Sequence, residues 1–414
     1  MGSWVGGRAF SQSEHSAPAT AEIQPMRVGL ITTLNTNIGD DFIREGICSV
    51  VRDLVPGPAL EFVLINKHRP EMLYGPNHPL RLIRTMVKGG LRRREWARRA
   101  SRVFRRVGST AFDACDLIVQ CGAPVYWEGC GHQTEWRQDL WEDVVARLHR
   151  RIPVLNLAAG SCYPYRRQPE RFAPNDEAFA RWLFGLCRAT SVRDPLAHAL
   201  LSRAGCQPEL IPCSAFLFTS PEQARRDPDG PILINYMRGG GHYDWDKNID
   251  AGIWDRTVRE VIADLRRRHR VIMLCHNQAE KSLAAEIAPD LPQLLPANAR
   301  EWAAVVRNAK TALCNRMHAS VALAGMGIPS VTVGTDTRLL MVEQLGVPCH
   351  YVADTSGAAL VRELEGTIDQ RSAVAARLAQ LQLTTRRAYA GLIGRFVTAE
   401  KSPAPRSPPL QAVA

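Results

Sequence analysis

The chain has 414 residues, of which 45% are hydrophobic and 22% charged, and its formal net charge at pH 7 is +11. This composition is typical of a globular protein with a sizeable core, and it excludes a disordered, collagen-like or fibrous chain. At roughly 100–200 residues per domain, the length favours two or three domains.

The two ends of the chain differ in composition from the rest. Residues 1–25 lack the apolar run of a secretory signal, so we expect a disordered leader. Residues 397–414 are rich in proline, so we expect a disordered tail. No stretch of about 20 mostly apolar residues could span a membrane. The scattered cysteines described below are typical of a cytoplasmic protein, which is the location we expect.

Apolar runs typical of strands alternate with helical patterns through both halves of the chain. This alternation predicts parallel sheets with right-handed crossovers. We predict an α/β fold of two doubly wound, Rossmann-like domains that face each other across a cleft, formed by residues 26–218 and 232–396. A stretch rich in proline and charge, 219–231, is the predicted linker, and Ala358–Phe396 is predicted to be one long helix.

The first strand-to-helix turn follows the predicted strand Arg27–Thr33. It reads Asn35-Thr36-Asn37-Ile38-Gly39-Asp40-Asp41, in which Gly39 permits close approach of a ligand to the backbone. The free N–H groups of the helix that follows favour an anion. The alternative is an ordinary polar turn in which Asp40 or Asp41 caps the helix.

Residues 81–107 carry ten of the eleven net positive charges. From Arg92 onward their apolar residues recur at helical spacing, which predicts an amphipathic basic helix. Such a helix can bind an anionic membrane surface, where each cation contributes about 1 kcal/mol. The alternative is a helix packed on its own domain with a solvated arginine face. Nucleic acid is not an expected partner, because no nucleic-acid-binding motif accompanies the charge.

The eleven cysteines are scattered through the chain, with no Cys-x-x-Cys pair. A disulfide framework or a zinc site needs closer, regular spacing. We therefore interpret the cysteines as reduced core residues. No cluster of metal-ligating residues stands out, and we predict no metal site.

Two further strand-to-helix turns carry candidate functional residues. Arg193 lies at the end of a predicted strand, directly before a helix capped by Asp194. Arg316 and His318 lie at the start of a helix of small residues that follows the strand Thr311–Cys314. In open α/β sheets, ligands bind at the carboxyl ends of the strands. A guanidinium and an imidazole at that place suit a small, highly anionic ligand.

The segment NRMHASVALAGMGIPSVTVGTDTRLLMVEQLGVP (Asn315–Pro348) resembles the signature of the polysaccharide pyruvyl transferase family. Three other segments resemble the family's preceding turns in order and spacing: NTNIGDDFIREG (Asn35–Gly46), CGAPVYWEG (Cys121–Gly129) and SVRDPLAHALLSRAG (Ser191–Gly205). The chain departs from the family at Cys213–Phe216, where an Asp-Pro-x-Phe turn is usual, and at Ala123, where glycine is common.

The resemblance implies a GT-B-like architecture and the transfer of a pyruvyl group from phosphoenolpyruvate to a saccharide as a ketal. Phosphoenolpyruvate is then the donor substrate, and no cofactor is implied. A saccharide carried on a lipid would also explain a membrane-binding basic helix, which adds a peripheral membrane location to the expected cytoplasmic one.

The resemblance also assigns roles to residues. It places Arg193 and Arg316 at the two anionic groups of phosphoenolpyruvate, with His318 either as acid/base or, protonated, as a phosphate contact. Arg338 is a further phosphate candidate. The other candidates are substrate contacts on the acceptor side: Asn37, Gly39, Asp40, Tyr126 and Trp127 (which could stack a sugar ring or pack in the core), and His242 on a glycine-rich loop.

Two other functions share the predicted fold. A GT-B glycosyltransferase would use a nucleotide sugar, but no two glutamates beyond residue 230 have the Glu-x₇-Glu spacing common among retaining enzymes of that type. A non-catalytic member would bind a glycan or associate with a membrane through residues 81–107. The first would release a nucleoside diphosphate, and the second would not depend on Arg316 or His318.

Overall fold

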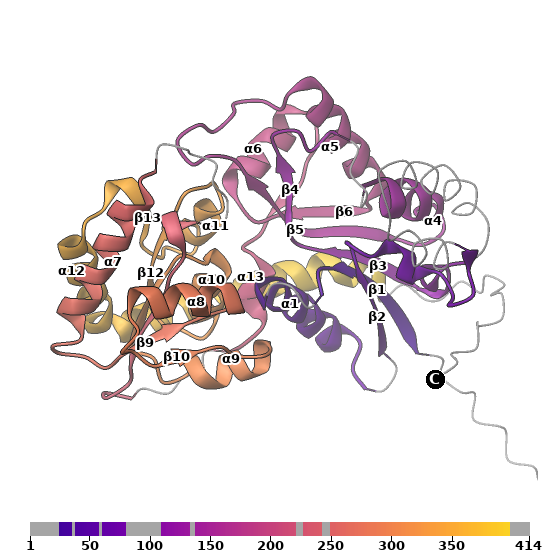
Figure 1. The fold of residues 1–414 in the computed structure, drawn as a ribbon. Coiled ribbons are helices and arrows are strands. Elements are labelled where there is room, and N and C mark those ends of the chain that lie inside the picture. The colour runs from indigo at the N-terminus through magenta and orange to yellow at the C-terminus, as the bar shows by residue number, and fades with distance from the viewer. Residues whose placement is uncertain are drawn as a thin grey trace, which may run out of the picture.

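The structure is a computed structural model that describes residues 25–34, 38–57, 60–79, 109–132, 137–220, 227–241 and 249–397. It contains two parallel sheets with helices packed around them, one in each half of the chain (Figure 1). The predicted basic helix 81–107 lies outside the described residues. So do the predicted leader and tail, apart from Pro25 and Val397.

The first domain is built on a sheet whose strands are β1 (Met26–Thr32), β2 (Leu60–Asn66), β3 (Leu117–Cys121), β4 (Pro124–Trp127), β5 (Val154–Cys162), β6 (Ala189–Val192) and β7 (Glu209–Leu210). Their order is β2-β1-β3-β5-β6-β7, with β4 paired to β5, and every pairing is parallel. The described helices are α1 (Ile38–Leu54), α4 (Ala146–Leu148), α5 (Pro174–Leu186) and α6 (Pro195–Arg203). A π-helical segment, Arg137–Val145, leads into α4.

The second domain repeats the design with β8 (Ile232–Asn235), β9 (Val271–Leu274), β10 (Gln293–Leu294), β11 (Thr311–Cys314), β12 (Ser330–Gly334) and β13 (Cys349–Tyr351). The order is β10-β9-β8-β11-β12-β13, again parallel throughout. The helices are α7 (Ala251–Leu265), α8 (Gln278–Ile287), α9 (Ala299–Val306), α10 (Met317–Gly325), α11 (Leu339–Glu343), α12 (Gly357–Asp369) and α13 (Arg371–Val397).

The two domains share one hydrophobic core. It joins residues of β1, α1, α10 and α13. Each domain also has a further core of its own, on the outer face of its sheet. Helix α10 is buried along its whole length, because its small residues allow its neighbours to approach closely. A Cβ on Gly325 would lie only 2.5 Å from the carbonyl oxygen of Phe216, in the first domain. Close packing therefore fixes the C-terminal end of α10 against the first domain.

The C-terminal helical region differs from the prediction of one long helix. It divides at Gln370, which ends α12 with φ −90° and ψ 4°. Helix α13 then crosses to the first domain (yellow in Figure 1), where the hydroxyl of Tyr389 donates to the carbonyl of Pro212 at 3.0 Å and Arg386 pairs with Asp53 at 2.5 Å. The division is needed because α12 packs on α7 and its own sheet, whereas α13 packs against α1.

The segment predicted as a turn over Cys121–Gly129 contains the short strand β4. Ala123, immediately before it, has φ 100°, a conformation that costs a residue with a Cβ roughly 1–3 kcal/mol. Ala158 on the neighbouring β5 has φ 55°, next to an irregularity in the pairing of β5 with β6. Backbone strain thus gathers at the carboxyl edge of the first sheet, where the candidate site lies.

Candidate active site

Arg193 extends from the carboxyl end of β6 into the contact between the domains. The turn is fixed on both sides, because the Arg193 N–H donates to the carbonyl of Ala159 at 2.9 Å and the Asp194 carboxylate accepts from the Ala197 N–H at 2.8 Å. The Arg193 side chain is fully buried. Its Nη1 lies 2.9 Å from Nε2 of His318 on α10, so one strand end from each domain contributes to the site.

The Arg193 guanidinium lacks the partners that a buried cation normally has. Its Nε and Nη2 make no hydrogen bond to any described residue, and no described carboxylate forms an ion pair with it. A Cβ on Gly160 would lie 2.5 Å from Nε, so this glycine makes the room that the side chain occupies. A buried charge is costly unless it is paired. Two unsatisfied donors on one guanidinium therefore mark a place for an oxyanion, which arginine binds with two N–H groups.

His318 is a neutral imidazole in this arrangement. Because a guanidinium can only donate, Nε2 of His318 accepts from Arg193, and the ring proton is on Nδ1. Burial lowers the pKa of His318 well below its usual range, and the positive charges of Arg193, Arg338 and Arg316 lower it further. Of the two predicted roles, this environment favours that of a neutral proton acceptor. A bound anion would offset these charges and raise the pKa.

We expect this histidine to make stability depend on pH. Below about pH 6.5 the unfolded chain binds a proton at His318 that the folded protein does not, so the free energy of unfolding should fall by up to about 1.4 kcal/mol per pH unit. Above that pH the contribution is constant. Urea unfolding between pH 5 and 7.5 should show a smaller slope for His318→Asn. The matched control His132→Asn, at an exposed position, should keep the wild-type slope; equal slopes in all three proteins would contradict the assignment.

Arg316 is held at the start of α10 by a buried acid. Its backbone N–H donates to Oδ1 of Asn235 at 2.8 Å, and its Nε and Nη2 lie 2.6 and 2.5 Å from Oε1 of Glu280. Its guanidinium is therefore turned toward Glu280. It is nonetheless close enough to His318 to lower the pKa of that imidazole.

Glu280 is the centre of a buried network. His276 lies 3.4 Å from Oε2 through Nδ1, and the backbone N–H of His276 and the side-chain amide of Asn235 donate to the same oxygen at 2.9 and 3.0 Å. Burial would raise the pKa of Glu280, but the hydrogen bonds from His276 and the charge of Arg316 outweigh it, so the pKa falls to about 2. The indole N–H of Trp302 donates to Nε2 of His276 at 3.0 Å, which places the ring proton on Nδ1, toward Glu280.

Sequence reasoning missed this network. Asn277 caps α8 by accepting from the backbone N–H of Glu280 at 2.9 Å, and such a cap is by itself a sufficient explanation for an asparagine that follows a strand. The sequence does contain a signal for this network, which is an acid three residues after a helix cap, shortly beyond a strand. Lys67, which follows β2, was missed as well. Burial lowers the pKa of Lys67, Asp40 opposes that shift and Arg193 adds to it, so Lys67 belongs to the charges around the site.

The remaining predicted site residues lie in several different places in the fold. Gly39 and the buried Asp40 lie in the first turn of α1. Arg338 pairs through Nε and Nη2 with the buried carboxylate of Asp336 at 2.8 and 2.7 Å, so that face of its guanidinium is occupied. Asn37 and His242 lie outside the described residues.

Of the two alternatives for Tyr126, stacking on a sugar and packing in the core, the structure shows packing in the core. Tyr126 is fully buried in the outer core of the first domain, because β4 places it beside Ser161 of β5 and against the ring of Phe172. No sugar ring can reach it there. Trp127, the next residue, is half-buried.

A polar contact joins the domains beside the site. The hydroxyls of Ser161 and Thr337 lie 2.8 Å apart, and the backbone N–H of Tyr163 donates to the Thr337 hydroxyl at 3.0 Å. Ser161 also donates to the Asp194 carboxylate at 2.8 Å, which connects this contact to the turn that carries Arg193. Burial raises the pKa of Asp194, although hydrogen bonds from Ala197 and Ser161 oppose the shift.

Two parallel-sheet domains that meet at the carboxyl ends of their strands define a GT-B-like protein, as predicted. The chain belongs to the polysaccharide pyruvyl transferase family: the family model described as "Polysaccharide pyruvyl transferase" matches residues 37–337, which contain Arg193, Arg316 and His318. This membership supports a transferase of polysaccharide biosynthesis. No curated protein sequence matched the chain.

Solved structures of similar fold cover nearly the whole chain. UDP-GlcNAc 2-epimerase from Neisseria meningitidis, bound to UDP-GlcNAc, has 13% identity and a TM-score of 0.51, covering 89% of this chain and 100% of its own. MnaA of S. aureus with UDP has 10% identity and a TM-score of 0.51, with coverage of 91% and 99%. The trehalose-6-phosphate synthase OtsA has 11% identity and a TM-score of 0.50, with coverage of 91% and 100%. At these identities the likeness concerns the fold alone.

The described residues contain neither a metal site nor a membrane-spanning helix. No three His, Cys, Asp or Glu side chains there gather in a way that could hold a metal ion. Within the same ranges, no helix combines the length and apolar character needed to cross a membrane.

Proposed function

We propose that this protein transfers the pyruvyl group of phosphoenolpyruvate to a saccharide, forming a ketal on two of its hydroxyls. The observation that carries the proposal is the fully buried guanidinium of Arg193, with two unpaired N–H donors beside a neutral imidazole from the other domain. Family membership supports the reaction class.

The residues fit the demands of the reaction. Phosphoenolpyruvate has a carboxylate and a phosphate, and Arg193 binds one of these through Nε and Nη2. Arg316 binds the other while its guanidinium stays paired with Glu280. Lys67 adds positive charge on the side of the first domain. Fixed cations aimed at the leaving phosphate stabilise the charge that develops as the C–O bond breaks.

The proton balance gives His318 its role. One sugar hydroxyl adds to C2 of the donor while the methylene carbon gains a proton, and the second hydroxyl adds as phosphate leaves. The two hydroxyl protons therefore end on the methyl group and on phosphate. His318, neutral and buried beside Arg193, takes a hydroxyl proton and passes it on, a contribution of typically 10²–10⁴ in rate. The reaction needs no cofactor.

The test measures the released product. The purified full chain, given phosphoenolpyruvate and a panel of glycan acceptors, should release inorganic phosphate only when an acceptor is present, and the acceptor should gain the mass of a pyruvate ketal. The same panel with UDP-GlcNAc in place of phosphoenolpyruvate should release no UDP. Release of UDP with glycosyl transfer, and no phosphate from phosphoenolpyruvate, would replace the proposal with a nucleotide-sugar glycosyltransferase.

A further inference from the structure

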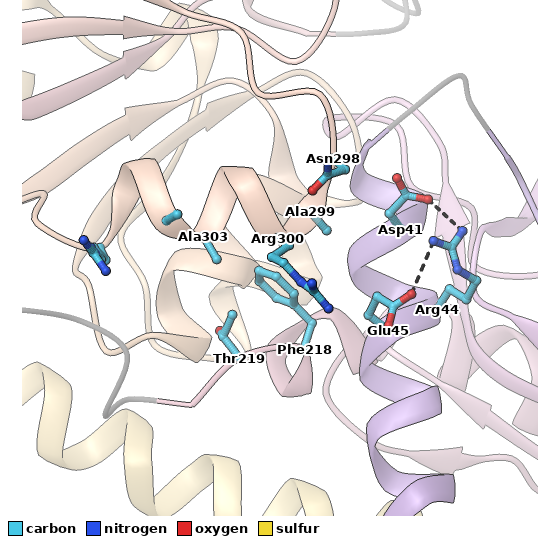
Figure 2. A pocket seen from close by; sticks show the side chains of 11 residues that line it. Asp41, Arg44, Glu45, Phe218, Thr219, Asn298, Ala299, Arg300 and Ala303 are labelled. Carbon is cyan, nitrogen blue, oxygen red and sulfur yellow. Dashed lines mark hydrogen bonds and ion pairs between the residues drawn. The ribbon is translucent and has the colours of Figure 1, made fainter. Parts of the chain in front are cut away.

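A pocket of about 730 Å³ lies between the domains, apart from Arg193 and His318. Its walls are α1 of the first domain and α9 of the second, and Phe218 and Thr219 lie between them (Figure 2). Pockets of 300–1,000 Å³ are typical of small-molecule sites. Asp41 lines the pocket and directly follows Asp40 in the first turn of α1. The pocket therefore adjoins the turn that belongs to the candidate active site.

The α9 wall carries two cations that are available to a ligand. Arg300 and Arg307 both line the pocket, and neither makes an ion pair or a side-chain hydrogen bond with any described residue. They are seven residues apart, about two helical turns, and therefore lie on one face of the helix. Ala303 and Ala304 line the pocket between them, so small side chains leave the space between the guanidinium groups open.

The α1 wall carries two carboxylates. Arg44 lies 2.7 Å from Asp41 and 3.4 Å from Glu45, and Glu45 also pairs with Arg52 at 3.8 Å. Each carboxylate keeps further lone pairs, which can accept from hydroxyl groups. Figure 2 shows Arg300 extending past the ring of Phe218 toward α1. Carboxylates, an aromatic ring and unpaired arginines thus surround one space.

We propose that this pocket binds the saccharide acceptor through a phosphate or diphosphate attached to it. The guanidinium groups of α9 bind the phosphate groups, because arginine matches phosphate oxygens with two N–H donors. The carboxylates of α1 accept from the sugar hydroxyls, and the Phe218 ring packs against an apolar sugar face. The identification of the ligand as the acceptor rests on the proposed pyruvyl transfer; the chemistry of the pocket does not.

Two sources of such a ligand share this chemistry: a sugar linked to a nucleoside diphosphate and a sugar linked to a lipid diphosphate. Binding to the full chain should be measured by calorimetry with UDP-GlcNAc, with GlcNAc diphosphate carrying a short prenyl chain, and with free GlcNAc. We expect one of the diphosphates to bind and free GlcNAc to bind at least tenfold more weakly. The diphosphate that binds more tightly identifies the source.

The variant Arg300→Ser/Arg307→Ser should bind that diphosphate about 10–100-fold more weakly. The control Arg267→Ser, which removes an exposed arginine of the same domain, should bind as the wild type does. Binding of phosphoenolpyruvate should stay within twofold in the double variant, because Arg193 and His318 are untouched. Since both substituted residues lie on the pocket wall, thermal unfolding should show that the variant folds.

The pocket proposal is overturned if no diphosphate binds the wild-type chain, if the double variant binds it unchanged, or if free GlcNAc binds equally well. Its failure is distinguishable from failure of the proposed function. A chain that binds the diphosphate but not phosphoenolpyruvate keeps the pocket and loses the pyruvyl donor. A chain that releases phosphate from phosphoenolpyruvate, at a rate unaffected by the double variant, keeps the function and loses the pocket.

Discussion

Replacing Arg193 by methionine should reduce phosphate release from phosphoenolpyruvate by at least about 10³-fold while making the protein about 1–2 kcal/mol more stable. The activity falls because the buried guanidinium is the group that would hold the anion. The stability rises because a desolvated charge with two unpaired donors is removed, and methionine fills much of the same volume. Loss of the hydrogen bonds from Nη1 to His318 and to Sγ of Cys213 offsets part of that gain.

Both effects can be measured on one preparation, by a phosphate-release assay and by urea unfolding. Arg188→Met is a matched control, because Arg188 is exposed and lies directly before β6; it should leave activity unchanged and stability within about 0.5 kcal/mol. An inactive Arg193→Met protein that is also destabilised by several kcal/mol would give Arg193 a structural role. A fully active one would remove the basis of the proposed function.

The sequence was sufficient to place the candidate residues at strand ends. Arg193, Arg316 and His318 follow strands of parallel sheets, and the carboxyl ends of such strands share one edge. That reasoning cannot show which side chains meet across the cleft. Arg193 and His318 are 125 residues apart, and their 2.9 Å contact depends on how α10 packs against the first domain.

The misses depend on contacts between segments that are distant in sequence. Tyr126 is buried because Pro124–Trp127 forms a strand beside β5, where a turn with a glycine on either side was predicted. The local pattern indicates Asn277 as a helix cap and assigns Glu280 no role, because its pairing with Arg316 depends on the pairing of β8 with both β9 and β11. The unpaired donors of Arg193 are a property of three-dimensional packing, which no local pattern records.

Replacing Glu280 by glutamine should have the second large effect. Glu280 is buried, and its pKa of about 2 means that its charge stabilises the folded state fully above about pH 4.5 and progressively less as pH falls toward 2. The shift corresponds to about 3 kcal/mol. We therefore expect the free energy of unfolding at pH 7 to fall by about 3–5 kcal/mol, since the variant leaves a partly buried arginine without its carboxylate.

The kinetic result of Glu280→Gln distinguishes a positioning role from a merely structural one. Without the carboxylate, Arg316 keeps its charge but loses its fixed orientation, so kcat should fall about 100-fold, while KM for phosphoenolpyruvate should not rise, because the freed cation still attracts the anion. The control is Glu286→Gln on the same helix, where an exposed acid pairs with Arg238; it should change neither constant and cost less than about 1 kcal/mol. A rise in KM with unchanged kcat would mean that Glu280 supports binding only, and unchanged kinetics in a destabilised variant would confine its role to the fold.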